Sequence, residues 1–110
     1  MAADQMPLLQ GTLDVLVLKT LTWGPNHGYG VARWIRETTE DALAIEDGAL
    51  YTSLHRLERR GLVESEWGTT AEGRRVKQYD LTTAGRRALR AQAEQWHRYV
   101  TAVGRVLQPA

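Results

Sequence analysis

The sequence contains no cysteine. Disulfide bonds, thiolate zinc sites and thiol nucleophiles are therefore excluded, and the absence fits a reducing cytoplasmic environment. No stretch approaches the roughly 18 consecutive apolar residues of a membrane span, and the first residues lack the basic and apolar regions of a secretory signal. We therefore expect a soluble, cytoplasmic protein that does not enter a membrane.

Patterns that carry catalysis or cofactor binding are also missing. No nucleophile has a recognisable base partner, and no glycine-rich phosphate loop occurs. His27, His55 and His97 are the three histidines, and they fall on different predicted elements without a carboxylate at helical spacing. This scatter argues against a metal site or an acid–base pair. We expect no cofactor, no metal and no enzymatic activity.

Charge is unevenly distributed along the 110 residues, although the net charge is only +1. Residues 1–49 carry three basic and seven acidic side chains, whereas residues 50–110 carry eleven basic and six acidic ones. A chain of this length forms one domain with a modest core. We therefore expect any contacts with phosphate groups to come from the second half.

Hydrophobic periodicity predicts three helices in the first part of the chain. Residues 11–21 are apolar on nearly every face, which is typical of a helix buried on two sides. A turn is expected at residues 23–26, followed by an amphipathic helix over residues 29–39. A third helix is expected over residues 48–60, with Asp47 as its N-cap, because a carboxylate there accepts hydrogen bonds from the first N–H groups.

The predicted third helix has two different faces. Leu50, Leu54 and Leu57 recur at helical spacing and are expected in the core, and Gly61 supplies a left-handed stop. The opposite face is polar and partly basic; it carries Thr52, His55, Arg56 and Arg59.

A β-hairpin with a cationic tip is predicted after this helix. Residues 62–67 and 74–81 form its strands, and residues 68–73 form the loop between them. Tyr79 and Leu81 share one face of the second strand. The basic residues near the turn are Arg74, Arg75 and Lys77.

The last segment, residues 83–107, predicts one long helix with a continuous heptad stripe. Its length of about 37 Å, at 1.5 Å per residue, exceeds what the preceding core can cover. Part of the stripe therefore needs a partner, most simply the same helix of a second copy. The stripe consists of Leu89, Ala93, Trp96, Val100, Val103 and Leu107.

This order of elements predicts a mainly α protein with a β-hairpin wing. We expect a winged helix-turn-helix that binds double-stranded DNA in residues 1–82 and a dimerisation helix in residues 83–110. A helix fits the major groove, and a basic hairpin can contact phosphates or enter the minor groove. The predicted DNA contacts are Tyr51, Thr52, Ser53, His55, Arg56, Arg59, Arg74, Arg75 and Lys77.

Four sequence blocks resemble the PadR-like transcriptional regulators, in the right order and at the right distances. They are residues 9–14, 27–29, 48–62 and 79–86. The resemblance implies a bacterial homodimer clasped by its first helix, including Leu13, and its last helix. It also implies repression of neighbouring genes and release by a small molecule or another signal.

The resemblance extends to individual residues and to the subtype. Tyr51 matches the start of the family's recognition helix, and the single helix after the wing matches the smaller subtype. One departure is Thr52, where the family usually has proline; threonine regains a backbone N–H and adds a hydroxyl near the groove. We therefore transfer no operator sequence.

Two points have alternative interpretations. Trp96 either fills volume in the dimer seam or, as in some small PadR-like proteins, stacks on planar aromatic ligands there. The acidic pair Glu46 and Asp47 lies where a phosphate would approach, which, with the small net charge, would also suit a winged-helix protein–protein interaction module without DNA binding. Retardation of DNA at low salt separates the two functions.

Overall fold

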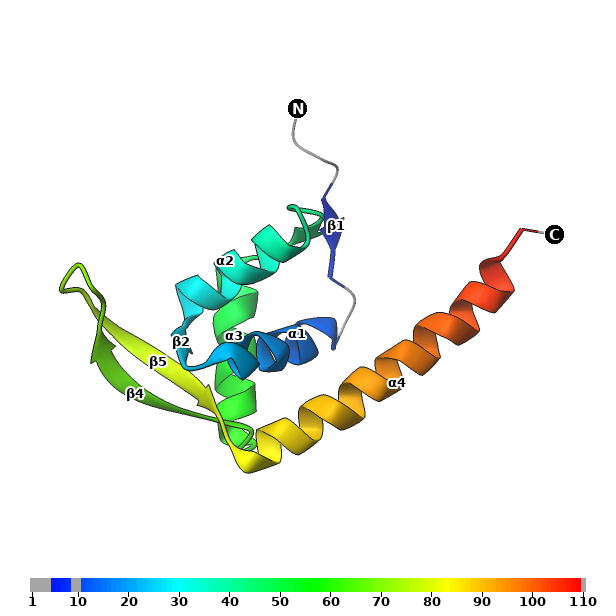
Figure 1. Ribbon diagram of the computed structural model, residues 1–110. Coiled ribbons are helices and arrows are strands. Elements are labelled where there is room, and N and C mark those ends of the chain that lie inside the picture. The colour runs from blue at the N-terminus through cyan, green and yellow to red at the C-terminus, as the bar shows by residue number, and fades with distance from the viewer. Residues whose placement is uncertain (1–4, 9–10, 110) are drawn as a thin grey trace.

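Three helices pack together beside a small β-sheet, and a fourth, longer helix leaves this core (Figure 1). The computed structural model describes residues 5–8 and 11–109 of the chain. The molecule is elongated, with principal extents of 56 × 39 × 21 Å, because the fourth helix projects from one end. The wing lies at the opposite end of the view.

The three predicted helices of the first part are confirmed. They are α1, Thr12–Thr20, α2, Gly28–Thr38, and α3, Asp47–Arg59, with a short 3-10 helix, Leu21–Trp23, after α1. The chain reaches φ +74° at Gly61, the left-handed stop expected after α3.

The prediction that Asp47 caps α3 is wrong by one position. Glu46 occupies the N-cap, and no side chain accepts a capping hydrogen bond there. Asp47 is the first helical residue, where its negative charge still suits the helix dipole. Its carboxylate lies 3.7 Å from the guanidinium of Arg36.

The predicted hairpin is confirmed, and it gains a third strand. The hairpin consists of β4, Val63–Thr69, and β5, Arg75–Leu81, paired antiparallel. A two-residue strand β2, Asn26–His27, pairs with the other edge of β5, at a place predicted as the end of a turn. A separate parallel pair joins β1, Met6–Pro7, to β3, Leu43–Ala44.

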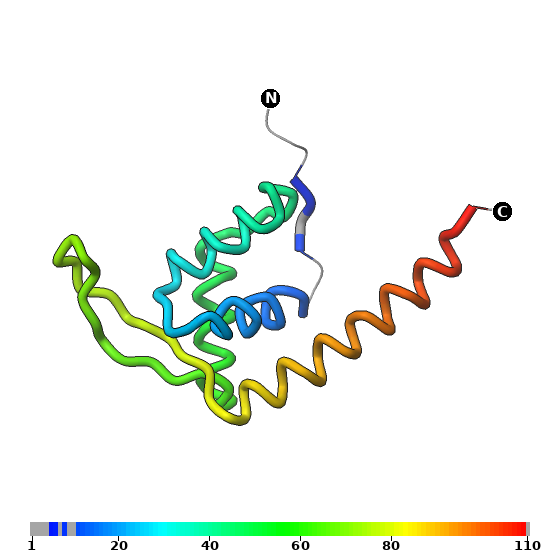
Figure 2. Tube along the Cα trace, viewed as in Figure 1, coloured from blue at the N-terminus to red at the C-terminus, as the bar shows by residue number. Residues whose placement is uncertain are grey.

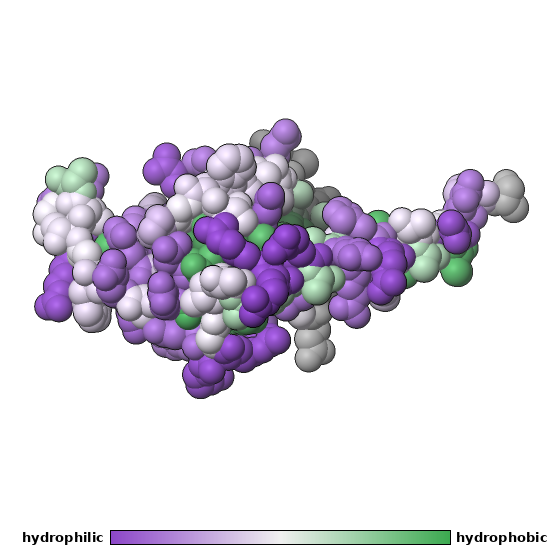
Figure 3. All heavy atoms as spheres, turned by 60° about the horizontal axis from the view of Figure 1, so that its bottom comes forward, coloured by the Kyte–Doolittle hydropathy of each residue, from purple (hydrophilic) through white to green (hydrophobic). Residues whose placement is uncertain are grey.

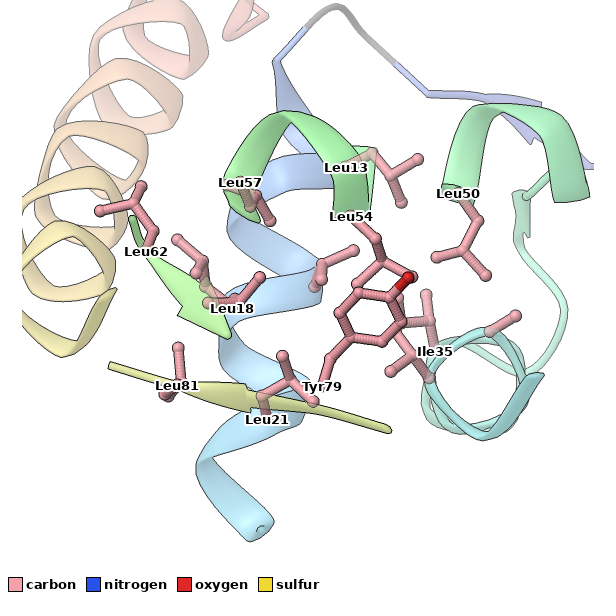
Figure 4. Close-up of a cluster of buried hydrophobic side chains, with 14 of the residues drawn as sticks. Leu13, Leu18, Leu21, Ile35, Leu50, Leu54, Leu57, Leu62, Tyr79 and Leu81 are labelled. Carbon is pink, nitrogen blue, oxygen red and sulfur yellow. The ribbon is translucent and has the colours of Figure 1, made fainter. Parts of the chain in front are cut away.

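The hydrophobic core lies between the three helices and β5 (Figure 4). Leu50, Leu54 and Leu57 of α3 are at most 1% exposed, as their spacing predicts. Tyr79 and Leu81 point from the same face of β5 into this cluster, and the Tyr79 ring lies near Leu54 and Ile35. Because the leucines of α3 fix its rotation, the side chains on its opposite face point away from the core.

The long helix α4 spans Thr83–Leu107, as predicted. Its start is tied to the end of α3: the Thr82 hydroxyl accepts a hydrogen bond from Gly85 N–H at 3.0 Å and donates one to the Gly61 carbonyl at 2.7 Å. Beyond its first turns, α4 diverges from the core (Figure 2). The predicted fold class, mainly α with a β-hairpin wing, is confirmed.

Candidate nucleic-acid interface

The outer face of α3 presents a polar stripe beside the wing. Thr52, His55 and Arg59 recur at spacings of three and four residues, and all three are exposed. Their positions follow from the leucines on the opposite side of the helix, which fix its rotation on the core. This stripe can enter a groove of DNA without unfolding any part of α3.

Of the predicted DNA contacts on α3, one faces inward and a second is held by an ion pair with α1. Ser53 is completely buried and donates a hydrogen bond to Asp14 Oδ1 at 2.6 Å. This burial corrects the prediction that Ser53 contacts DNA. Arg56 is 42% exposed, but its guanidinium grips the same carboxylate, with Nε donating to Asp14 Oδ2 at 2.9 Å and Nη2 donating to Oδ1.

Tyr51 combines a structural contact with exposure. Its side chain is 43% exposed, and its ring packs on Gly28 so closely that a Cβ there would lie 2.7 Å from Cε1 of the tyrosine. Next to Gly28, Nδ1 of His27 accepts a hydrogen bond from Gly30 N–H at 3.0 Å and caps α2. His27 is therefore the N-cap of α2.

The three cations of the wing have different surroundings. Arg75 stacks over the exposed ring of Trp67 at 4.7 Å from its centroid, a cation–π contact that orders the guanidinium. Lys77 Nζ lies 3.9 Å from Glu58 Oε1 of α3, so the wing and α3 are linked by an ion pair. Arg74 is exposed at the loop.

An open cleft of about 840 Å³ separates the wing from the start of α2. Cationic and ring-bearing side chains line most of it, and Glu72 is the single acidic side chain among those that line it. Such a surface suits a sugar–phosphate strand, because fixed positive charges attract phosphate oxygens. The lining cations are Arg33, Arg74, Arg75 and Lys77, and the rings are His27, Tyr29, Tyr51 and Trp67.

The predicted dimer residues fall into three groups. Leu13 is only 8% exposed and packs in the core of the single chain, and its place in a dimer interface stays a prediction. Val100, Val103 and Leu107 are 47%, 36% and 74% exposed on the projecting part of α4. Leu89, Ala93 and Trp96 are partly buried nearer the core.

A second cleft, of about 530 Å³, lies between α1 and α4. Trp96 lines it together with Tyr99, whose ring stacks on the tryptophan with centroids 6.1 Å apart. Asp14 and Val15 contribute the α1 side. The predicted ligand residue therefore borders an open space and not a closed core.

The sequence model of the transcriptional regulator PadR-like family matches residues 17–91. This chain belongs to the PadR-like family. The prediction that the protein is not an enzyme is confirmed, because the family and its structural neighbours are transcriptional regulators. This PadR-like protein is accordingly a DNA-binding transcriptional regulator.

Solved structures resemble this PadR-like protein over most of their length. A PadR family transcriptional regulator from Eggerthella lenta is 35% identical with a TM-score of 0.77, covering 92% of this chain and 86% of that one. A transcriptional regulator from Clostridium thermocellum is 26% identical with a TM-score of 0.79, covering 87% and 93%. An uncharacterized protein X from Lysinibacillus sphaericus is 26% identical over 89 residues, covering 81% of this chain and 82% of the relative.

The described part of this PadR-like protein holds no group of three or more His, Cys, Asp or Glu side chains placed to bind a metal. Within the same residues, none of the helices has the length and apolar character to cross a membrane. Leu9 and Gln10 of the first resembling block lie outside the described residues. The sequence analysis did not identify Asp14, Glu58 and Trp67, which contact the predicted site residues. For Asp14 a signal was available, because it is the one carboxylate in the apolar stretch 11–21.

Proposed function

We propose that this PadR-like protein is a homodimeric repressor that reads a two-fold symmetric operator with α3 and the wing of each protomer. The observation that carries this proposal is the exposed stripe of Thr52, His55 and Arg59 lying next to a cationic wing. The helix reads base edges in the major groove, while the wing neutralises phosphates. Residues 1–82 form the DNA-binding unit and residues 83–110 the dimerisation helix.

The contact set on DNA is narrower than the sequence predicts. Ser53 is left out because it is buried, and Arg56 is engaged with Asp14. The proposed contacts are Tyr51, Thr52, His55, Arg59, Arg74, Arg75 and Lys77.

The dimer is supported by the apolar residues on the projecting part of α4. Val106 is 83% exposed and Leu107 is 74% exposed, and hydrophobic side chains are visible toward the free end of the right-hand arm in Figure 3. A single chain gains nothing by exposing such a stripe, whereas two antiparallel or crossed copies bury it. Sedimentation should give a dimer, and Val100→Asp should shift it to a monomer.

An effector is proposed for the cleft between α1 and α4. The stacked rings of Trp96 and Tyr99 offer a flat apolar surface to planar aromatic compounds, which would then release the repressor from DNA. Such compounds should quench tryptophan fluorescence. The effector proposal is wrong if the same quenching persists in Trp96→Ala.

A gel-shift titration tests DNA binding, using DNA from the gene's own upstream region and unrelated DNA as competitor. The double variant Arg74→Ala/Arg75→Ala should lose specific retardation and reduce the slope of log K against log salt by up to roughly two phosphate contacts. Arg98→Ala/Arg105→Ala is the matched control, since it removes the same charge from exposed positions of α4. Equal affinity for both DNAs at low salt would instead favour the protein–protein interaction module.

A further inference from the structure

The carboxylate of Asp14 joins α1 to two residues of α3. Oδ1 accepts from the Ser53 hydroxyl and from Arg56 Nη2, and Oδ2 accepts from Arg56 Nε. The partners lie 39 and 42 residues away in sequence. Arg56 thus uses two donors of its planar group on one carboxylate, the two-point geometry that fixes both position and orientation.

Because Asp14 is buried, its contact with Ser53 and Arg56 favours one orientation of α3 against α1. The Asp14 side chain is only 12% exposed. Burial alone would raise the pKa of Asp14, but the hydrogen bonds from Arg56 and Ser53, with the charges of Arg56 and Arg60, outweigh it and lower the pKa. The carboxylate is therefore charged, and leaving it without these partners in a rotated α3 would be unfavourable.

The fastening lies immediately beside the DNA-reading stripe. Ser53 directly follows Thr52, and Arg56 directly follows His55. A rotation of α3 that displaces the bonded residues Ser53 and Arg56 therefore also displaces the exposed residues Thr52 and His55. Arg56 reaches Asp14 from the flank of the stripe, and its bonded nitrogens are then unavailable to phosphate.

We propose that Asp14 is a positioning residue for DNA reading: it fixes the rotation of α3 against α1, and it holds Arg56 away from the DNA phosphates. The inference rests on the proposed function, since it concerns the same face of α3. It reassigns Arg56 from a DNA contact to a structural partner of Asp14. It also gives the carboxylate in the apolar helix α1 a role in operator selection.

The test uses Asp14→Asn, which keeps the size of the side chain but removes its charge. The DNA is the duplex that the wild-type protein selects from a random pool. In Asp14→Asn the preference for this duplex over unrelated DNA should fall about tenfold, the scale of one lost base contact. The salt slope should steepen by about 0.9, because the released Arg56 finds a phosphate.

Three further variants separate positioning from general damage. Arg56→Gln alone should leave the wild-type salt slope unchanged but lower the preference for the selected duplex. Asp14→Asn/Arg56→Gln should return the slope to the wild-type value. Ser53→Ala, which removes one hydrogen bond while the Arg56 contact persists, should leave the slope unchanged. Circular dichroism verifies folding, and Arg56→Gln carries the test if Asp14→Asn does not fold.

Two results would overturn the inference with DNA binding intact. One is a shallower slope in Arg56→Gln, which would place Arg56 on a phosphate. The other is an unchanged slope and preference in a folded Asp14→Asn. In the protein without DNA, the Arg56 Nε–H signal in NMR should exchange slowly with solvent in the wild type and rapidly in Asp14→Asn. If the wild type selects no duplex, the proposed function fails, and the DNA-reading role of Asp14 fails with it.

Discussion

Replacing Gly85 with alanine should destabilise the protein, although alanine is the better helix former. Gly85 is buried in the first turn of α4, and a Cβ there would overlap the Leu62 carbonyl oxygen and lie 3.0 Å from Leu81 Cδ2. The overlapped carbonyl is backbone and also accepts from Thr82 N–H, so it cannot rotate away. We expect a cost of about 3 kcal/mol from overpacking, offset by about 1 kcal/mol of helix propensity.

The net loss of about 2 kcal/mol corresponds to a fall in Tm of roughly 8 °C for a domain of this size. Thermal unfolding followed by circular dichroism measures it, at one protomer concentration because the proposed dimerisation would make Tm depend on concentration. Gly48→Ala is the matched control: Gly48 is helical and exposed, nothing lies within 4 Å of its Cβ position, and the variant should gain stability. A Gly85→Ala protein as stable as the wild type would refute this account of the packing.

Substitutions at two positions test the hydrogen bonds that Thr82 makes at the start of α4 and that Asp14 makes with α3. Thr82→Ala should cost about 1 kcal/mol in thermal unfolding, because the N-cap bond to Gly85 is lost, whereas Thr82→Ser keeps the hydroxyl and should stay near the wild type. Asp14 has a lowered pKa when folded, so its stabilising effect is present above its unfolded pKa of about 3.9 and is lost as pH falls through the folded value. Tm measured from pH 6 down to pH 2 should therefore fall less steeply in Asp14→Asn; parallel curves would contradict this.

Elements governed by local periodicity could be predicted from the sequence. The helix α4 was predictable because its heptad stripe, from Leu89 to Leu107, can be recognised without knowledge of the rest of the chain. The hairpin was predictable for a similar reason, since alternation and a glycine-containing loop are encoded within about 20 residues. The leucines at helical spacing in α3 likewise identified its buried face.

Features that depend on distant partners could not be predicted. Ser53 lies at helical spacing from Leu50 and Leu57, so periodicity places it on the buried face of α3. Its hydrogen-bond partner, Asp14 of α1, is 39 residues away and could not be identified from that spacing. The strand β2 has two residues and exists because β5 offers a free edge there. The error at Asp47 is of another kind, because helix ends vary by a residue when no side chain caps them.

The short connection between the wing and α4 has a consequence for the length of the DNA site. Only Thr82 separates the last residue of β5 from the first residue of α4, and its side chain is bonded on both sides. In the proposed dimer, the angle between the two α4 helices therefore sets the distance between the two reading faces. A tilt of about 5° moves the far end of a ~37 Å helix by about 3 Å, close to the roughly 3.4 Å rise of one base pair. A few degrees of rotation at the dimer seam thus change which half-site spacing the protein matches.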